Sequence, residues 1–361
     1  MSVPLLTPEL PGTSGLTRVA AEDFFVEELP LYEPSGEGEH LYLTVEKVGR
    51  TTQEVAREIA QALGVREREV GTAGQKDKRA VTVQRMSVHS RAPAEEALKI
   101  SGPGFRVLQA ARHGNKLRTG HLRGNSFRIV VRGCVPAALA RAQAVCARLR
   151  QLGAANLFGP QRFGKYGDNA ELGRKILSRE AQVRDRFLRR MALSALQSEL
   201  FNRCLSVRIA DGLFSNAVAG DVLRKRATGG LFVCEDPALD APRVARGEVD
   251  PAGPLPGHSL FAARGEALAR EERVLAEAGI DPRSFAAGGD DMQGARRPYR
   301  VPVEDLFVEE AGEGALRLSF SLPKGSYALA VLREVQKSDI AADENQGSEL
   351  GGAGGEEFPP A

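Results

Sequence analysis

The sequence predicts an α+β protein with two domains, and three observations support this. Apolar and polar residues alternate strictly over 316–322 and less strictly over 41–45, which is typical of strands with one buried face. Apolar residues recur at helical spacing over 52–63 and over 182–209. Over 210–300 the character changes to short strand-like pieces, loops, and acids mixed with bases. A chain of 361 residues is long enough to bury two cores.

The helix over 52–63 has the clearest local signals. Thr51 and Glu54 have the spacing of a capping box, in which each side chain accepts a hydrogen bond from the backbone of the other residue. Gly64 follows the last apolar position and is a typical helix stop. Further elements of the first half are strands over 81–88 and 127–132 and a helix over 136–152.

The second half contains the long helix and several shorter elements. After Lys337 the chain is acidic, rich in Gly and almost free of large apolar residues, so we predict a disordered acidic tail over 339–361. The remaining elements are a helix over 182–209, a strand over 231–234, a Pro- and Gly-rich loop over 251–257, a helix over 265–278, a strand over 316–322 and a helix beginning near Val331.

Composition points to a reducing cytoplasm. The N-terminal residues have neither the basic nor the apolar region of a signal peptide, and no apolar run is long enough to span a bilayer. The four cysteines are scattered without C-x-x-C spacing, which indicates neither a zinc site nor a disulfide framework. We therefore expect a cytoplasmic protein with no membrane association and no metal.

The charge distribution favours nucleic-acid binding. The net charge is +2, but the tail over 339–361 carries six acids and no Lys or Arg, which leaves +8 on residues 1–338. Over 102–167 there are twelve Lys and Arg and not one Asp or Glu. A surface that faces phosphates excludes acids in this way. The alternative is a solvated basic face of unrelated purpose.

Asp77 is the strongest candidate for a catalytic carboxylate. It lies between Lys76 and the pair Lys78-Arg79, after a Gly74 turn and before a β-branched run. Nearby cations favour the ionised form of a carboxylate, which suits a nucleophile or a base. The same cations suit a polyanionic substrate. A solvated surface turn is the alternative interpretation of this segment alone.

The segment over 156–165 predicts an ordered loop that contacts RNA. Its Gly and Pro content excludes a helix or strand interior. Two aromatic, two cationic and two amide side chains in ten residues are suited to stacking on bases, holding phosphates and reading base edges. For Phe163, packing in the core and contact with RNA are equally compatible with the pattern.

Eight motifs in order along the chain resemble the TruD family of tRNA pseudouridine synthases, from about Arg18 to Glu334. The resemblance rests on short patterns spread over three hundred residues, so it covers nearly the whole chain. The motifs lie at Glu22-Asp23-Phe24-x-Val26-x-Glu28, 36–41, Ala73-Gly74-Gln75-Lys76-Asp77-Lys78 with 80–82, Gly124-Asn125-x-Phe127, 156–164, 193–195 with 200–202, Gly220-Asp221, and Leu322-Pro323-x-Gly325-Ser326-x-Ala328.

The resemblance implies a pseudouridine synthase fold, which is α+β with a mixed, largely antiparallel central sheet and an inserted second α+β domain. It implies a discontinuous catalytic domain over 1–181 and 302–338, with an insertion domain over 182–301. The implied activity is isomerisation of uridine to pseudouridine in tRNA, typically at uracil 13 of the D-arm, without cofactor or metal. We expect a monomer.

The resemblance also implies roles for individual residues. Asp77 is the catalytic carboxylate, either as a nucleophile or as a base that removes a sugar proton. The target base must leave its stack, and the residues expected around it or its phosphates are Phe24, Asn156, Tyr327, Arg18, Phe158, Arg162 and Lys76. Two of these depart from the family pattern, since Tyr327 stands where Phe is usual and Arg18 where Lys is common. The rival interpretations are a non-catalytic RNA-binding protein on the same fold and a carboxylate-dependent hydrolase.

Overall fold

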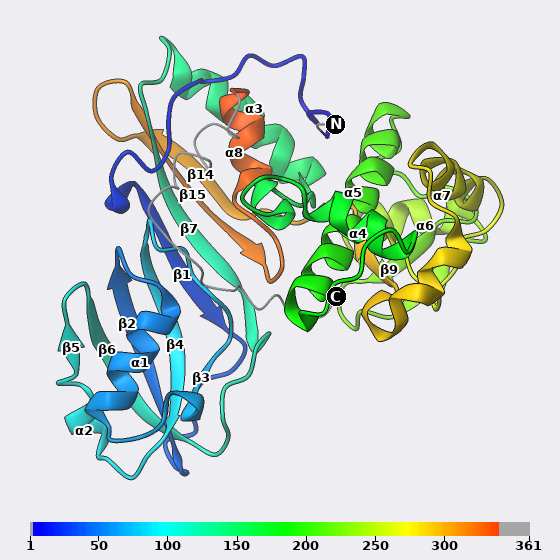
Figure 1. The fold of residues 1–361 in the computed structure, drawn as a ribbon. Helices are drawn as coiled ribbons and strands as arrows, with labels where there is room; N and C mark the ends of the chain where they lie inside the picture. Colours follow the sequence, from blue (N-terminus) through cyan, green and yellow to red (C-terminus); the bar gives the residue numbers. More distant parts are fainter. Residues whose placement is uncertain (1–2, 339–361) are drawn as a thin grey trace.

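The computed structural model describes residues 3–338, so the predicted tail over 339–361 lies outside the described residues. Among the described residues, nine strands form the main sheet, which runs diagonally through Figure 1. These strands are β1 (Phe24–Pro30), β2 (His40–Val48), β3 (Val70–Thr72), β4 (Val81–His89), β5 (Ser101–Gly102), β6 (Phe105–His113), β7 (Leu122–Arg132), β14 (Glu304–Glu310) and β15 (Ala315–Pro323).

The main sheet combines both ends of the described chain. Its order is β14-β15-β7-β1-β4-β2-β6-β5, with β3 beside β4. The pair β1–β4 is parallel, and the other pairs are antiparallel. This confirms the predicted α+β class with a mixed, largely antiparallel central sheet. The parallel pair places the start of β1 beside the start of β4, immediately after the loop that carries Asp77.

Helix α1 (Thr52–Ala62) covers the β2–β4–β6 half of this sheet and confirms the predicted helix. Its capping box forms as expected: the Glu54 N–H donates to Thr51 Oγ1 at 3.2 Å, and the Thr51 N–H donates to Glu54 Oε2 at 2.8 Å. Val55 and Ile59 are fully buried against the strands. The helix is therefore fixed by its cap at one end and by its apolar face.

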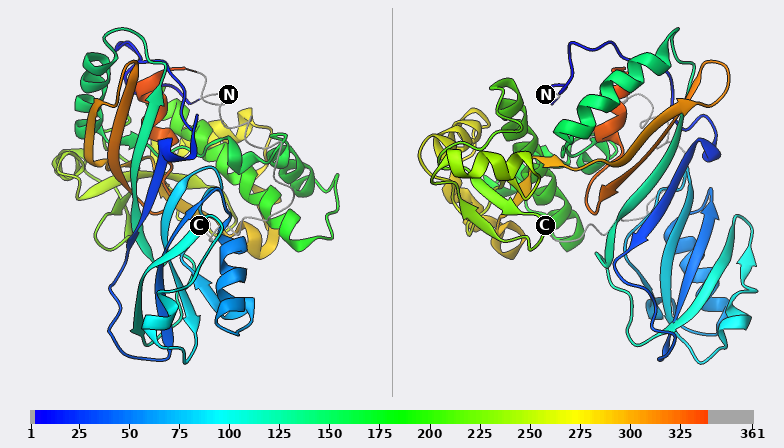
Figure 2. Two further views of the ribbon diagram at one scale, coloured as in Figure 1. Left: turned by 90° about the vertical axis from the view of Figure 1, so that its left-hand side faces the viewer. Right: turned by 180° about the vertical axis from the view of Figure 1, so that it is seen from behind.

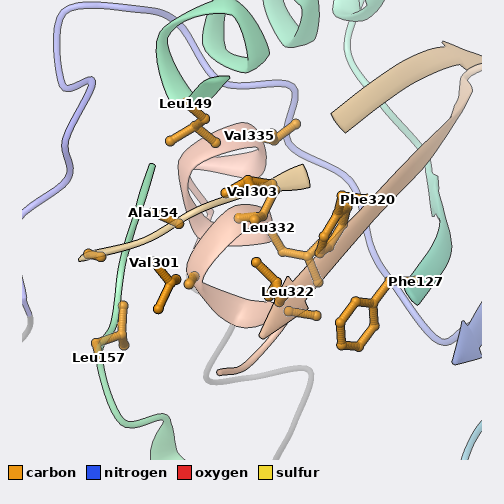
Figure 3. Packing of buried hydrophobic residues seen from close by; sticks show 14 of the residues in the cluster. Phe127, Leu149, Ala154, Leu157, Val301, Val303, Phe320, Leu322, Leu332 and Val335 are labelled. Atoms are coloured by element: carbon orange, nitrogen blue, oxygen red, sulfur yellow. The ribbon is translucent and has the colours of Figure 1, made fainter. Parts of the chain in front are cut away.

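Helices α3 (Ala138–Leu152) and α8 (Leu329–Gln336) cover the other half, beside β7 and β15 (Figure 3). Both confirm predicted helices, and β15 confirms the strand predicted over 316–322. The four apolar side chains of that alternation are at most 2% exposed: Leu316, Leu318, Phe320 and Leu322. Figure 3 shows Leu149 of α3 and Val335 of α8 among the packed apolar side chains of this core.

The N-terminal segment before β1 lies against α8 (Figure 1). Glu334 of α8 is fully buried, and its carboxylate accepts hydrogen bonds from the Leu6 N–H at 2.7 Å and from the Thr7 N–H and hydroxyl at 3.2 and 2.9 Å. Further along, Leu16 and Arg132 of β7 exchange two backbone hydrogen bonds. These contacts fix the course of the chain up to residue 17, directly before Arg18.

The segment from β8 (Ala154–Ala155) to β13 (Arg300–Val301) builds a second group of elements, beside the main sheet in Figures 1 and 2. Its long helix α5 and strand β10 confirm the predictions over 182–209 and 231–234, and α7 confirms the helix over 265–278. A four-stranded sheet has the order β10-β9-β11-β12. The elements are β8 (Ala154–Ala155), α4 (Asn169–Leu177), α5 (Arg186–Ala210), β9 (Val222–Lys225), β10 (Leu231–Val233), α6 (Pro237–Ala245), β11 (Val249–Leu255), α7 (Gly265–Glu277), β12 (Ala295–Pro298) and β13 (Arg300–Val301).

We propose that this group forms the insertion domain expected over 182–301. In support, the main sheet contains strands from both sides of it and none from within it. Helix α4 packs against α5 through Ile176 and Leu177, so we propose that the domain also includes α4. The short elements elsewhere are α2 (Ala94–Ala97) and 3₁₀ segments at Ala21–Asp23, Glu67–Glu69, Pro160–Phe163 and Pro282–Met292.

The prediction of a loop over 251–257 is wrong, because residues 251–255 belong to the buried strand β11. This strand pairs with β9 from Val249 to Pro251 and with β12 from Ala252 to Leu255. Ladder pairing along β11 is therefore with one strand at a time, which tolerates prolines, although the Pro251 carbonyl also accepts a hydrogen bond from the Tyr299 N–H. Gly253 is required because a Cβ atom there would lie 2.3 Å from the Tyr299 ring. Local composition cannot reveal this long-range packing.

Candidate active site

A cleft of about 1020 Å³ lies where the main sheet meets the second group of elements. Its lining comes from the start of β1 and the loop between β3 and β4 on one side and from β11 and β12 on the other. All eight site residues that the sequence predicted line this one cleft: Arg18, Phe24, Lys76, Asp77, Asn156, Phe158, Arg162 and Tyr327. The structure thus brings together residues more than three hundred positions apart.

Asp77 lies on the loop between β3 and β4 with its carboxylate accessible from the cleft. Its Oδ2 accepts a hydrogen bond from Arg18 Nη2 at 2.7 Å, and the Asp77 side chain is 36% exposed. Arg18 has a positive φ of 58°, an unusual conformation for a residue with a side chain. Its guanidinium carbon lies 4.1 Å from the centre of the Phe24 ring. Arg18 is therefore held between an aromatic face and the carboxylate whose charge it stabilises.

Phe24 belongs to both the core and the cleft. It is 4% exposed, and its ring meets Phe127 edge-on with the ring centres 6.5 Å apart. One face also carries the Arg18 guanidinium. The structure therefore supports core packing for this ring and places it in the lining of the cleft as well.

Lys47 lies beneath the Asp77 loop and was missed by the sequence analysis. Its side chain is fully buried, and its Nζ donates to the backbone carbonyls of Arg50, Lys76 and Asp77 at 2.8, 3.2 and 2.9 Å. Burial lowers the pKa of Lys47 to about 8, and the Asp77 carboxylate opposes this shift. The three donors of one ammonium thus fix two consecutive carbonyls of the loop, including that of Asp77 itself.

Lys76 faces inward beside Asp77. Its Nζ lies 3.1 Å from Glu28 Oε2 and donates to Asn125 Oδ1 at 2.7 Å. The side chains of Lys76 and Glu28 are 8% and 1% exposed. The Lys76 N–H also donates to Thr52 Oγ1 at 3.0 Å, which ties the loop to α1. Lys76 therefore anchors the loop, and Asn125 is a cleft residue that sequence reasoning did not select although it stands in the Gly124-Asn125-x-Phe127 motif.

The opposite wall is organised by Arg297 of β12, a second residue that the sequence analysis missed. Arg297 Nη2 donates to Asn156 Oδ1 at 2.5 Å and to the Gly325 carbonyl at 2.8 Å, and its Nε donates to the Asn156 carbonyl at 3.2 Å. Asn156 is 4% exposed, and its Nδ2 donates to the Pro298 carbonyl at 2.9 Å. Both ends of the Asn156 amide therefore have protein partners, so here it positions Arg297.

Three further predicted residues complete this wall. Phe158 packs edge-on against Phe201 with the ring centres 5.6 Å apart, and the Arg297 guanidinium lies 4.2 Å from its ring centre. Arg162 Nε donates to Ser198 Oγ of α5 at 3.0 Å, and its Nη2 donates to the hydroxyl of Ser194. Tyr327 lies at the start of α8, partly buried against the main core, and lines the cleft.

Cations of the basic stretch over 102–167 mostly contact other parts of the protein and not the cleft. Of its twelve cations, only Arg162 lines the cleft within the described residues. Arg132 pairs with Asp23 at 2.7 Å, and Arg150 donates to the Leu306 carbonyl at 2.8 Å. The argument that this stretch forms a phosphate-facing surface therefore stays a prediction. Apart from Arg18 and Arg162, the arginines that line the cleft come from residues 224–300, which sequence reasoning did not single out.

Residues 3–338 contain neither a candidate metal site nor a candidate membrane span. No group of three or more His, Cys, Asp or Glu side chains in this part of the chain is arranged to hold a metal ion. No helix in the same range has the length and apolar character needed to cross a bilayer. All four cysteines are free thiols.

Comparison with known proteins identifies the family. The profile described as "tRNA pseudouridine synthase D (TruD)" matches residues 1–184 and 181–335. A relative named tRNA pseudouridine synthase D from Anaeromyxobacter sp. (strain Fw109-5) is 56% identical over 342 residues, which are 93% of this chain and 96% of the relative. Another of that name, from Thermus thermophilus, is 48% identical over 334 residues and covers 92% of each chain.

A solved structure confirms the fold expected from the resemblance. The structure from Methanosarcina mazei, which carries the same family name, superposes with a TM-score of 0.78 at 24% identity, over 93% of this chain and 97% of that chain. At that identity the likeness concerns the fold alone. The sequence profile and the relatives show the rest: the chain belongs to the tRNA pseudouridine synthase D (TruD) family.

Proposed function

We propose that this protein isomerises uridine to pseudouridine in tRNA, at uracil 13 of the D-arm, with Asp77 as the catalytic carboxylate. Family membership makes it a pseudouridine synthase, and thus an isomerase. The observation that carries the residue assignment is the ion pair of Asp77 with Arg18 at 2.7 Å, in the lining of a cleft that also contains aromatic side chains. We further propose the cytoplasm as the place of action.

The reaction needs one ionised carboxylate next to the sugar. The N-glycosidic bond breaks, the uracil rotates, and a carbon–carbon bond forms between C1′ and C5, while C5 loses its proton and N1 gains one. Asp77 serves either as the nucleophile at C1′ or as the base that removes a sugar proton, and both roles require the anion. Arg18 stabilises this anion, and Lys47 fixes the backbone on which it stands. Because product and substrate are isomers, the reaction has no net gain or loss of atoms or electrons.

The geometry of the cleft suits a base that has left its stack. Phe24 and Tyr327 line the cleft from β1 and from the start of α8, and Phe158 lines it from the loop after β8. Aromatic faces stabilise an extruded base by stacking. We propose that Phe24 and Tyr327 contact the flipped uridine and that Asn156 acts through Arg297.

The hydrolase alternative needs a second carboxylate within reach of the scissile bond. Asp250 also lines the cleft, but it is 3% exposed and paired with both Arg226 and Arg300 at 2.5 Å. Glu304 lines the cleft from the start of β14. Its replacement by Gln is the direct test of that alternative, and we expect it to leave pseudouridine formation unchanged.

The test of the position is pseudouridine mapping by carbodiimide modification and primer extension. A tRNA transcript with U13 is incubated with wild-type protein, and a matched transcript with C13 serves as control. We expect a new stop at position 13 of the first transcript and none in the second. A stop elsewhere in the D-arm would support the activity but overturn the proposed position. Tight binding without any stop would favour the non-catalytic RNA-binding alternative.

A further inference from the structure

Arginines are concentrated along the wall of the cleft formed by β9, β11 and β12, and most of them have acid partners. Buried cations are stable only when an anion or several acceptors compensate them. Three arginines that line the cleft here meet that condition: Arg226 and Arg300 with Asp250, and Arg296 with Glu271. Arg297 and Arg224 line the same cleft, yet neither forms an ion pair with any Asp or Glu in residues 3–338.

The hydrogen bonds of Arg297 leave one side of its guanidinium free. Nε and Nη2 are used for Asn156 and Gly325, whereas Nη1 has no hydrogen-bond partner within the described residues. Burial lowers the pKa of Arg297 to about 10, and the charges of Arg162 and Arg224 add to that effect while Tyr327 opposes it. The group is still protonated at neutral pH. Three cations therefore repel one another in a cleft without a compensating acid at Arg297.

We propose that Arg297 and Arg224 form a phosphate-binding site for the backbone of the bound RNA, next to the turn that carries Tyr327. This inference rests on the proposed function, because the phosphate is that of the tRNA substrate. A phosphodiester would satisfy the free Nη1 donors and relieve the repulsion between the arginines. The Gly325 contact of Arg297 lies two residues before Tyr327, so the phosphate would lie beside the flipped uridine.

A purely structural role for Arg297 is the competing explanation, since Arg297 also joins Asn156 to Gly325. Arg224 separates the two explanations. It is exposed on β9, and its side chain forms neither a hydrogen bond nor an ion pair with the residues that the structure describes. Its loss should not affect folding, so any effect on RNA binding reports on the charge itself.

The experiment measures the affinity for a tRNA transcript as a function of salt. Asp77→Asn serves as the background so that no turnover occurs, and the variants are Arg224→Gln, Arg297→Lys and Arg297→Met. Each phosphate contact contributes about one unit to the slope of log K against log salt. We expect Arg224→Gln and Arg297→Met each to bind about tenfold more weakly and to lower the slope by about one, and Arg297→Lys to keep the slope.

Arg264→Gln is the matched control, because Arg264 is 70% exposed, pairs with Glu235 and lies outside the cleft lining. We expect its slope to equal that of the parent protein. A second readout uses a D-arm RNA with one methylphosphonate beside the target uridine, which removes a single phosphate charge. The parent protein should bind this RNA more weakly than the unmodified RNA. Arg297→Met should bind the two RNAs with nearly equal affinity.

The outcomes separate this site from the proposed function. Unchanged slopes for both Arg224→Gln and Arg297→Met, together with pseudouridine formation by the protein that retains Asp77, would overturn the site and leave the function standing. Lower slopes, together with no pseudouridine formation by the protein that retains Asp77, would support the site and overturn the function. A parent protein that does not bind tRNA would overturn both. If Arg297→Met has a lowered melting temperature, the salt slope of Arg224→Gln alone tests the site.

Discussion

Lys47 is a buried cation that we expect to cost stability and to support catalysis. Its pKa falls from 10.5 to about 8 because the ammonium is buried. One pKa unit corresponds to about 1.4 kcal/mol, so the charged form costs about 3 kcal/mol at neutral pH. The three carbonyl acceptors, which include those of Lys76 and Asp77, offset this cost and order the loop.

Lys47→Met is the perturbation that separates the two effects. Met has a similar length without the charge, so the burial cost of about 3 kcal/mol disappears, while three carbonyls lose a donor at about 1 kcal/mol each. We expect the free energy of unfolding at pH 7 to change by less than about 1.5 kcal/mol. The Asp77 loop loses its anchor, and a misplaced catalytic group can cost about 100-fold in rate. We expect kcat to fall about 10- to 100-fold with little change in tRNA affinity.

The pH dependence supplies the second readout. The folded pKa of Lys47 lies below the unfolded value, so its cost to stability is complete below about pH 8 and disappears between about pH 8 and pH 10.5. Over the same range the neutral amine has only two donors for three carbonyls, so activity should decline above about pH 8. Asp77, Lys76 and Glu54 are the charged groups that act on Lys47.

Denaturant unfolding and single-turnover kinetics from pH 6 to pH 9.5 test this reasoning. In Lys47→Met the decline of activity above about pH 8 should be absent, and the exposed Lys99→Met should behave as wild type. An unchanged kcat in Lys47→Met would refute the positioning role. A loss of more than about 3 kcal/mol of stability, with activity falling only in proportion to the unfolded fraction, would refute the expectation that the relieved burial cost and the lost hydrogen bonds nearly cancel.

Three further predictions concern neighbouring contacts. Arg18→Gln removes the ion pair with the catalytic carboxylate, so single-turnover kinetics should show kcat about 10- to 100-fold lower with an unchanged melting temperature. Lys76→Met leaves Glu28 buried without its cation and should destabilise the protein by about 3 kcal/mol; adding Glu28→Gln should restore most of this in denaturant unfolding, and a failure to restore it would contradict the pairing. Glu334→Gln cannot accept all the hydrogen bonds of the N-terminal segment and should cost about 2 kcal/mol, whereas a neutral result would show that Thr7 and its neighbours hold the segment without it.

Local signals predicted the elements whose patterns are contained in a few residues. The capping box at Thr51 and Glu54 and the alternation over 316–322 are of this kind, and both are confirmed. The strand β1 was not predicted, because its buried face includes Glu28, whose burial depends on the distant Lys76. The strand β11 was taken for a loop, because Gly253 makes room for Tyr299.

Site residues could be predicted where the type of side chain itself indicates a chemical role. They could not be predicted where the role depends on partners that are distant in the sequence. Asp77 and the aromatic residues could be selected from motifs, and all of them line one cleft. Lys47 lies near the end of strand β2, where a lysine ordinarily faces solvent, and only the fold places it under the Asp77 loop. Arg297 follows another arginine, and nothing local separates Arg296, which pairs with Glu271, from Arg297, which pairs with no acid in residues 3–338.

The measurement that tests the central claim most directly is pseudouridine mapping on tRNA with wild-type and Asp77→Asn protein, with tRNA affinity measured on the same samples. Asn keeps the size of the side chain and removes its charge, so binding should stay within about threefold while pseudouridine formation falls below detection. Formation at the wild-type rate by Asp77→Asn would contradict the assignment of Asp77 as the catalytic carboxylate.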